Sequence, residues 1–126
     1  MSLKAVSTNG APTAMGPYSQ GIDAGSLVFV AGQVGRDPAS GELPDGIEAQ
    51  SERAMRNISA ILDAAGLTWA NVAKTTCLLA EITDFEAFNS VYVRFVGDPK
   101  PARATYAVKA LPGGALIEIE AFAVRT

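Results

Sequence analysis

The sequence predicts an α+β domain in which helices cover one face of a sheet. Three observations support this fold class. The 126 residues fit one domain, spanning 1–126, with one core. Hydrophobic residues make up 48% and charged residues 18%, which is a globular composition. The hydrophobic period also alternates between strand and helix spacing, in the order hairpin, helix, strand, helix and two strands.

The N-terminal third is predicted to contain a loop, a hairpin and a second loop. Residues 6–20 are rich in Asn, Gly, Pro, Ser and Thr, which favours a shaped loop. Residues 22–23 and 27–31 are short apolar runs around turn-forming residues, so they predict a hairpin. We expect Gly32 to end its second strand. Gly and Pro recur through residues 35–46, which indicates a surface connection.

Two helices and a buried strand are predicted next. Apolar residues at helical spacing predict a helix over residues 47–65, with Gly66 as its C-terminal cap. Residues 72–82 are apolar and β-branched, as expected of a buried strand. Residues 83–86 have capping-box spacing and begin a second helix, which is expected to continue to Gly97.

Aromatic residues recur on one face of the second predicted helix. We interpret this stripe as core rather than as a cofactor pocket; it consists of Phe85, Phe88, Tyr92 and Phe95. The prolines of residues 98–101 then stop the helix. Residues 116–124 alternate as a strand, which places Glu118 and Glu120 on the same side. The sheet face without helices is a surface on which a partner subunit could pack.

Residue types that are scarce in the chain exclude several kinds of site. The sequence contains no histidine, so the Ser-His-Asp and Cys-His nucleophile systems are excluded. Cys77 is the single cysteine, which rules out an intrachain disulfide and makes a zinc site improbable. We therefore expect no metal, and we interpret Cys77 as a buried strand residue.

Charge and hydropathy exclude further classes of partner. The formal net charge is −3, so the chain lacks the positive charge that drives sequence-independent phosphate binding. We expect no nucleic-acid partner. The apolar runs are far shorter than the ~20 residues that span a bilayer. The chain is accordingly expected to be soluble and cytoplasmic, with no membrane association.

Arg103 and Glu118 are the most informative pair of candidate site residues. Arg103 lies in the segment Pro-Ala-Arg-Ala-Thr-Tyr, and Glu118 follows fifteen residues later. A planar guanidinium binds a carboxylate or phosphate through two parallel hydrogen bonds, and a nearby glutamate moves protons or positions water. If the two side chains meet, they define a small-anion site with its own acid or base.

An ordered set of motifs along nearly the whole chain resembles the RidA/YjgF family of reactive intermediate deaminases. The motifs are Gly16-Pro17-Tyr18-Ser19-Gln20-Gly21, Ala31-Gly32-Gln33, Lys74-Thr75-Thr76, Asp84-Phe85 with Asn89, Tyr92 and Phe95, Pro-Ala-Arg-Ala-x-Tyr at 101–106, Lys109-x-Leu111, and Ile117-Glu118-Ile119. The resemblance implies a chorismate-mutase-like α+β fold, with a mixed, mainly antiparallel sheet and two helices on one face.

The resemblance also implies an activity and an assembly. Members hydrolyse enamine and imine intermediates, such as 2-iminobutanoate and 2-iminopropanoate, to 2-oxo acids and ammonia. They are hydrolases acting on C=N bonds, and the substrate is a small imine or enamine that bears a carboxylate. The implied assembly is a homotrimer whose clefts lie between subunits, and the implied cofactor requirement is none.

Site roles are carried over position by position. Arg103 is expected to bind the substrate carboxylate. Glu118 is expected to be catalytic, by orienting or deprotonating water or by shuttling a proton between nitrogen and carbon. Tyr18 is the second catalytic candidate, since it would close the pocket and offer its hydroxyl. Gly32 would let the backbone approach the ligand, and Asn89 would hydrogen-bond substrate or water.

Two further positions in the expected substrate site depart from the family pattern. Thr105 stands where many imine-deaminating members carry cysteine, and Ala31 stands where serine is common. Both changes alter the shape and polarity of the pocket, so they bear on the preferred substrate more than on the class of activity.

Two alternatives to the deaminase remain open at this point. The same Arg103 would serve a non-catalytic regulator that binds small 2-oxo or amino acids. The third hypothesis is a ribonuclease or translation inhibitor, and the acidic charge balance counts against it.

Overall fold

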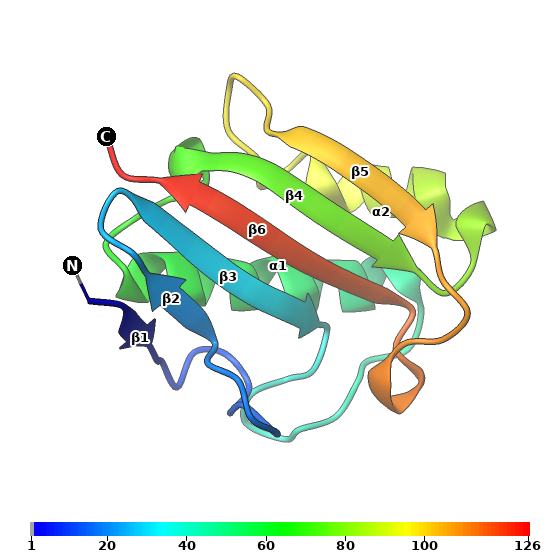
Figure 1. The fold of residues 1–126 in the computed structure, drawn as a ribbon. Helices are drawn as coiled ribbons and strands as arrows, with labels where there is room; N and C mark the ends of the chain where they lie inside the picture. Colours follow the sequence, from blue (N-terminus) through cyan, green and yellow to red (C-terminus); the bar gives the residue numbers. More distant parts are fainter. Residues whose placement is uncertain (1) are drawn as a thin grey trace.

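One six-stranded sheet with two helices behind it forms the fold (Figure 1). The computed structural model describes residues 2–126. The strands lie in the order β1-β2-β3-β6-β4-β5. They are β1 (Lys4–Val6), β2 (Gly21–Asp23), β3 (Leu27–Val34), β4 (Val72–Leu79), β5 (Ala102–Ala107) and β6 (Ile117–Val124). The predicted α+β class and the predicted hairpin, β2 with β3, are confirmed.

Strand direction explains why both helices cover the same face. All neighbouring strands pair antiparallel except β4 and β5, so β3, β4 and β5 run in one direction. The chain passes from β3 to β4 through α1 (Ile47–Ala64) and from β4 to β5 through α2 (Phe85–Tyr92). Crossovers between parallel strands are right-handed, and two successive crossovers in one direction place both helices on one side. The other face therefore has no helix over it (Figure 1).

Strand β3 is longer than the sequence predicted. It continues through Gly32 to Val34, so the expected end at Gly32 is wrong. Between Val30 and Gln33 the pairing with β6 shifts register, and the strand resumes with Val34 opposite Glu118. Such a bulge lets one strand carry an extra residue without ending the sheet. Residues 4–6, which were not predicted as a strand, pair with β2 as β1.

Helix α1 ends as its sequence predicts. Gly66 takes a left-handed φ of 78°, which favours glycine. Its N–H donates to Asp63 O at 2.9 Å, and Leu67 N–H donates to Leu62 O at 2.9 Å. These two hydrogen bonds form a Schellman motif that satisfies carbonyls of the last turn.

Three boundaries around α2 differ from the prediction. Strand β4 ends at Leu79 rather than at residue 82. Residues Ile82–Asp84 form a short 3-10 turn, and Asp84 at the N-cap makes no side-chain capping bond, so the predicted capping box is wrong. The helix ends at Tyr92 instead of continuing to Gly97. The local 3-10 geometry before the helix takes the place of the capping box that the spacing suggested.

The aromatic stripe of α2 packs into the core, as expected. Phe88 is fully buried, Tyr92 is buried, and both belong to a cluster with Cys77 and Ile119. Burial raises the pKa of the Cys77 thiol to about 11, so this cysteine is a neutral buried side chain. The prediction that Cys77 is a buried strand residue is confirmed.

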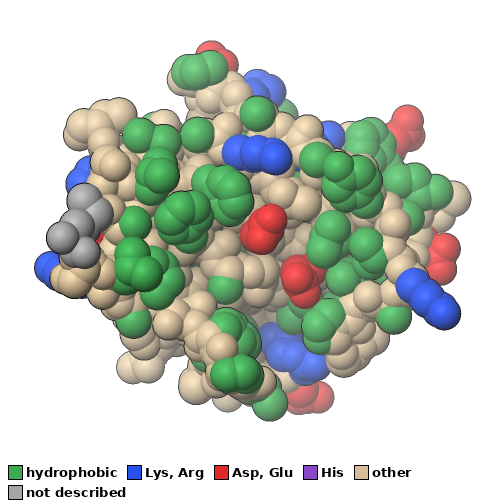
Figure 2. Space-filling model, in the orientation of Figure 1, with side chains coloured by type: hydrophobic (Ala, Val, Ile, Leu, Met, Phe, Trp, Pro, Cys, Tyr) green, Lys and Arg blue, Asp and Glu red, His purple; other side chains and the backbone are tan. Residues whose placement is uncertain are grey.

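The helix-free face of the sheet carries large apolar side chains. Leu27, Phe29, Tyr106 and Phe122 are each more than a third exposed, and the rings of Phe29 and Phe122 meet edge to face at 5.3 Å. Figure 2 shows hydrophobic side chains spread over this face, with acidic side chains among them. Within residues 2–126 no helix is long and apolar enough to cross a bilayer.

Candidate active site

A cavity of about 500 Å³ beside the end of β3 contains four of the seven predicted site residues. We call it the Glu118 pocket. It lies between β3, β6 and the loop before β2. They are Pro12, Met15, Tyr18, Ala31, Gly32, Gln33, Val34, Arg36, Pro112 and Glu118. Three sequence segments, at residues 12–18, 31–36 and 112, therefore converge on Glu118.

Glu118 projects from the central strand β6 on the helix-free face. Along β6 buried residues on the helix side alternate with more exposed residues on the free side, and Glu118 is half-buried opposite Val34. Burial raises the pKa of its carboxyl above the ordinary glutamate value, and the negative charge of Glu120 raises it further. A carboxyl with a raised pKa exchanges protons closer to neutral pH, which suits an acid or base.

Gly32 makes room for the Glu118 carboxyl. A Cβ on residue 32 would collide with Glu118 Oε2 and would lie 2.9 Å from its carboxyl carbon. The sequence suggested that Gly32 allows a ligand to approach the backbone. The structure gives a different reason for glycine, because the Glu118 side chain itself lies over this position.

We expect Gly32→Ala to lower kcat of the imine hydrolysis that the family resemblance implies by about 10- to 100-fold, because displacement of a reacting group by about 1 Å costs that much. The φ of Gly32 lies outside the left-handed region, so alanine is not excluded by the backbone. The measurement is steady-state kinetics of Gly32→Ala with and without Glu118→Ala. If the collision with Glu118 is the cause, Gly32→Ala has little further effect in the Glu118→Ala background. An equal loss in both backgrounds would contradict this explanation.

Replacing Glu120 is expected to change the pH dependence rather than the maximal rate. Glu120→Gln removes a negative charge that raises the pKa of Glu118, so the kinetic limb that reports Glu118 moves to lower pH. The limb moves to lower pH whether Glu118 acts as a base or as an acid. The folded state loses stability as pH rises from the ordinary glutamate pKa to the raised one, and Glu120→Gln reduces that loss. The pH dependence of kcat/KM measures the shift of the limb, and the pH dependence of the thermal unfolding temperature measures the change in stability. A limb that moves to higher pH would refute the charge coupling between Glu120 and Glu118.

Arg103 lies outside the Glu118 pocket, against helix α2. Its Cζ is 5.4 Å, 5.7 Å and 4.8 Å from the ring centroids of Phe85, Phe88 and Tyr92. Its Nη1 donates to Asn89 Oδ1 at 2.7 Å. Cation–π contacts and a side-chain hydrogen bond thus fix the guanidinium beside a separate cavity of about 340 Å³, which Lys100 also lines. The arginine is positioned before any anion binds.

Arg103 and Glu118 do not meet within one chain. Glu118 pairs with Leu78 of β4, and Leu78 pairs with Tyr106 of β5. Arg103 precedes Tyr106 by three residues, and successive side chains of a strand point to opposite faces. Arg103 therefore projects on the helix side of the sheet and Glu118 on the free side. Strand β4 also separates their two strands (Figure 1).

Of the remaining predicted residues, Tyr18 and Ala31 line the Glu118 pocket, Asn89 lines the cavity beside Arg103, and Thr105 lines neither. Tyr18 is half exposed in the Glu118 pocket, and its hydroxyl accepts a hydrogen bond from Met15 N at 3.4 Å. Ala31 lines the same pocket and donates its N–H to Gln20 O at 2.9 Å. Asn89 lies beside Arg103 and uses its carbonyl oxygen to hold that arginine. The Thr105 hydroxyl is buried and has no hydrogen-bond partner within residues 2–126.

Sequence reasoning missed several residues that line these cavities, and three of them have long side chains. Arg36 and Met15 belong to the Glu118 pocket, and Lys100 lies beside Arg103. Arg36 and Met15 are in segments that we read only as loops. The signal for Arg36 was a charged residue two positions beyond the end of β3, but its place in the pocket depends on how the loops fold back.

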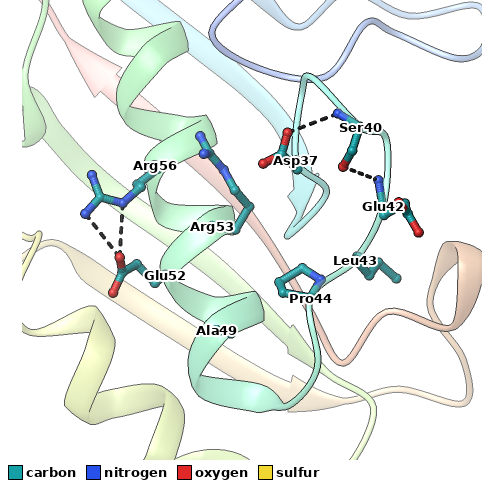
Figure 3. Close-up of a pocket in the computed structure, with 9 residues that line it drawn as sticks. All are labelled: Asp37, Ser40, Glu42, Leu43, Pro44, Ala49, Glu52, Arg53 and Arg56. Atoms are coloured by element: carbon teal, nitrogen blue, oxygen red, sulfur yellow. Dashed lines mark hydrogen bonds and ion pairs between the residues drawn. The ribbon is translucent and has the colours of Figure 1, made fainter.

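Another cavity, of about 590 Å³, lies between α1 and the loop at residues 37–44 (Figure 3). None of the predicted site residues lines it. Glu52 bonds to Arg56 at 3.1 Å and to Arg94 at 2.8 Å, and Asp37 accepts the backbone N–H groups of Ala39 and Ser40. Most of its charged groups already have partners within the chain, so the Glu118 pocket is the stronger candidate.

Comparison with known proteins identifies the family. A family model described as Endoribonuclease L-PSP matches residues 8–125. A mouse protein named 2-iminobutanoate/2-iminopropanoate deaminase is 46% identical over 123 residues, which cover 97% of this chain and 91% of the mouse protein. The chain belongs to the RidA/YjgF family. A goat protein of the same name is 49% identical and matches 95% of this chain and 88% of its own length.

Solved structures of similar proteins share the RidA/YjgF fold. A putative endoribonuclease from Thermotoga maritima superimposes with a TM-score of 0.94 at 44% identity and covers 98% of each chain. Escherichia coli TdcF, solved with bound serine, gives a TM-score of 0.94 at 38% identity and covers 98% of this chain and 99% of its own. The RidA/YjgF membership predicted from the motifs is confirmed.

Proposed function

We propose that this RidA/YjgF chain hydrolyses 2-iminobutanoate and 2-iminopropanoate to the corresponding 2-oxo acids and ammonia. The observation that carries the proposal is Glu118, a half-buried carboxyl with a raised pKa in a cavity beside Tyr18. The names of the mouse and goat relatives give the substrate class. An imine needs only water and proton transfers to be hydrolysed, which fits a chain without histidine.

The reaction can be balanced around one carboxyl group. Ionised Glu118 takes a proton from water as the water oxygen bonds to the imine carbon. The proton passes from Glu118 to nitrogen, which gives a carbinolamine. Glu118 then moves a second proton from the carbinolamine hydroxyl to nitrogen as the carbon–nitrogen bond breaks, and the products are a 2-oxo acid and ammonia. Burial and Glu120 raise the pKa of Glu118, which makes its carboxylate a stronger base for the first step.

Binding of the substrate carboxylate by Arg103 in this pocket requires a second copy of the chain. Arg103 is held by Asn89 on the helix side of the sheet, whereas Glu118 lies on the free side. In this proposal Arg103 of one subunit reaches the Glu118 pocket of its neighbour, and three such sites close a homotrimer. The exposed apolar side chains of the free face, Phe29 and Phe122 among them, support association through that face.

The test generates 2-iminobutanoate from threonine with a pyridoxal-phosphate dehydratase and follows its decay. We expect the wild-type chain to accelerate decay to 2-oxobutanoate and ammonia. An unchanged decay rate would refute the deaminase. Tight binding of 2-oxobutanoate without acceleration would instead favour a regulator. Sedimentation tests the assembly, since a folded monomer at assay concentration is incompatible with shared sites.

The printed family description also refers to an endoribonuclease. Glu118 and Glu120 lie on the same side of β6, and the chain carries a formal charge of −3. Both place negative charge where a phosphodiester would have to bind, and RNA binding generally relies on basic and aromatic surfaces. We therefore favour the deaminase.

A further inference from the structure

Arg36 is a charged group in the Glu118 pocket for which the proposed reaction has no use. It lies two residues after the end of β3 and lines the cavity together with Tyr18, Pro112 and Glu118. The cavity of about 500 Å³ falls in the range of pockets that hold ligands well above four carbons in size. The pocket thus has both room and a positive charge beyond what a small monocarboxylic imine requires.

The Arg36 guanidinium is held in place by two loops. Its Nη1 donates to Gly41 O at 2.8 Å, in the loop that follows β3. On another side it packs directly against Gly113, because a Cβ on that glycine would overlap Nη2 and would lie 3.2 Å from Cζ. Gly113 has a left-handed φ of 65°, so both the backbone and the neighbouring arginine favour glycine there. The charged group is therefore ordered before a ligand arrives.

Most of the hydrogen-bonding capacity of Arg36 is unused. A guanidinium has five N–H donors, and within residues 2–126 the bond to Gly41 is the one recorded for Arg36. The ion pairs of the same residues involve Arg56, Arg94 and Arg125, whereas Arg36 has no carboxylate within 4.0 Å. A half-buried arginine without a carboxylate partner at a pocket wall is suited to a planar anion such as a carboxylate.

Arg36 and Glu118 occupy different parts of the same pocket. They form no ion pair, and the causes of the raised pKa of Glu118 are burial and Glu120, not a balancing arginine. A ligand can therefore place its reacting carbon at Glu118 and a second group at Arg36 without the two side chains neutralising each other.

We propose that Arg36 binds a second carboxylate on the substrate, so that this chain prefers imines of dicarboxylic amino acids to those of monocarboxylic ones. The inference rests on the proposed function, in which Arg103 of a neighbouring subunit binds the first carboxylate. The reaction is unchanged: water adds to the imine carbon, the carbon–nitrogen bond breaks, and a 2-oxo dicarboxylic acid and ammonia are released.

The test compares two imines made in place by oxidases: 2-iminosuccinate from D-aspartate and 2-iminopropanoate from D-alanine. Semicarbazide traps the remaining imine, and the fall in trapping gives kcat/KM for each. The wild-type ratio of the diacid to the monoacid value is expected to exceed one. Arg36→Met should lower that ratio about tenfold or more, since one charge-assisted hydrogen bond is lost. Arg36→Lys keeps the charge and should retain part of the preference.

Arg56→Met is the matched control. It removes the same charge from a surface position on α1, where Arg56 pairs with Glu52 outside the Glu118 pocket. Its ratio should equal that of the wild type. A wild-type ratio of one or below, or an equal ratio in wild type and Arg36→Met, overturns the inference while leaving the deaminase intact.

Measurements of ligand binding test the role of Arg36 even if the proposed enzymatic activity is absent. If wild type turns over neither imine, the proposed function fails, and calorimetry with 2-oxoglutarate and 2-oxobutanoate then decides the role of Arg36. A loss of affinity of about tenfold in Arg36→Met for 2-oxoglutarate alone supports the second carboxylate site. Equal changes for the two acids, or no change, overturn it.

Discussion

Glu118→Gln should reduce kcat for 2-iminopropanoate hydrolysis by about 100- to 10,000-fold, the usual contribution of general acid–base catalysis. Glutamine keeps the size of the side chain and its position over Gly32 but cannot exchange the proton. KM should change little, because the proposal assigns binding of the substrate carboxylate to Arg103 rather than to Glu118. Steady-state kinetics with imine generated by an oxidase measure the effect.

Glu120→Gln is the matched control for the loss of one carboxylate on the same strand. Its maximal rate should stay close to that of the wild type, and only its pH profile should move. Retention of more than about a tenth of wild-type kcat in Glu118→Gln would show that water is activated elsewhere.

Arg103→Ala should lower kcat/KM about 10- to 100-fold, because a charge-assisted hydrogen bond to the substrate carboxylate is lost. Arg103→Lys should recover little of this, since lysine cannot make the forked contact or stack on three rings in the same way. Asn89→Ala should have a smaller effect in the same direction, because Asn89 acts by holding Arg103.

Mixing two impaired variants, Arg103→Ala and Glu118→Gln, tests whether sites are shared between subunits. In trimers assembled from equal amounts of Arg103→Ala and Glu118→Gln, about a quarter of the sites combine an intact Arg103 with an intact Glu118 from the adjacent copy. Activity should return to about that fraction after co-expression. No recovery from demonstrably mixed trimers would mean that both groups act from one chain, contrary to the proposal.

Features that depend on nearby residues could be predicted from the sequence. The alternation in residues 116–124 placed Glu118 and Glu120 on one side, and the pKa of Glu118 responds to Glu120 as that placement requires. The cap at Gly66 was equally local, because a left-handed residue after an apolar periodic run ends a helix. The family could also be predicted from short sequence motifs, because each motif consists of residues close together in the chain.

Features that depend on distant pairing could not be predicted. The close approach of Glu118 to Gly32 requires the shifted register between β3 and β6, which no pattern near Gly32 encodes. The separation of Arg103 from Glu118 is set by the alignment of both strands with β4. Arg36 enters the pocket only because Gly41 and Gly113, far apart in sequence, both pack against it.

Because β6 lies between β3 and β4, the Glu118 pocket cannot form until β6 has been synthesised. This last strand of the chain lies between β3 and β4 and pairs with both. Until it emerges from the ribosome, the ribbon β1-β2-β3 and the pair β4-β5 share no strand-to-strand hydrogen bonds. Pairing over such sequence distances is slow, and the unpaired edges of β3 and β4 remain open to other chains meanwhile. Glu118 lies on the strand that joins the two parts of the sheet, so the Glu118 pocket forms only after β6 has paired with β3.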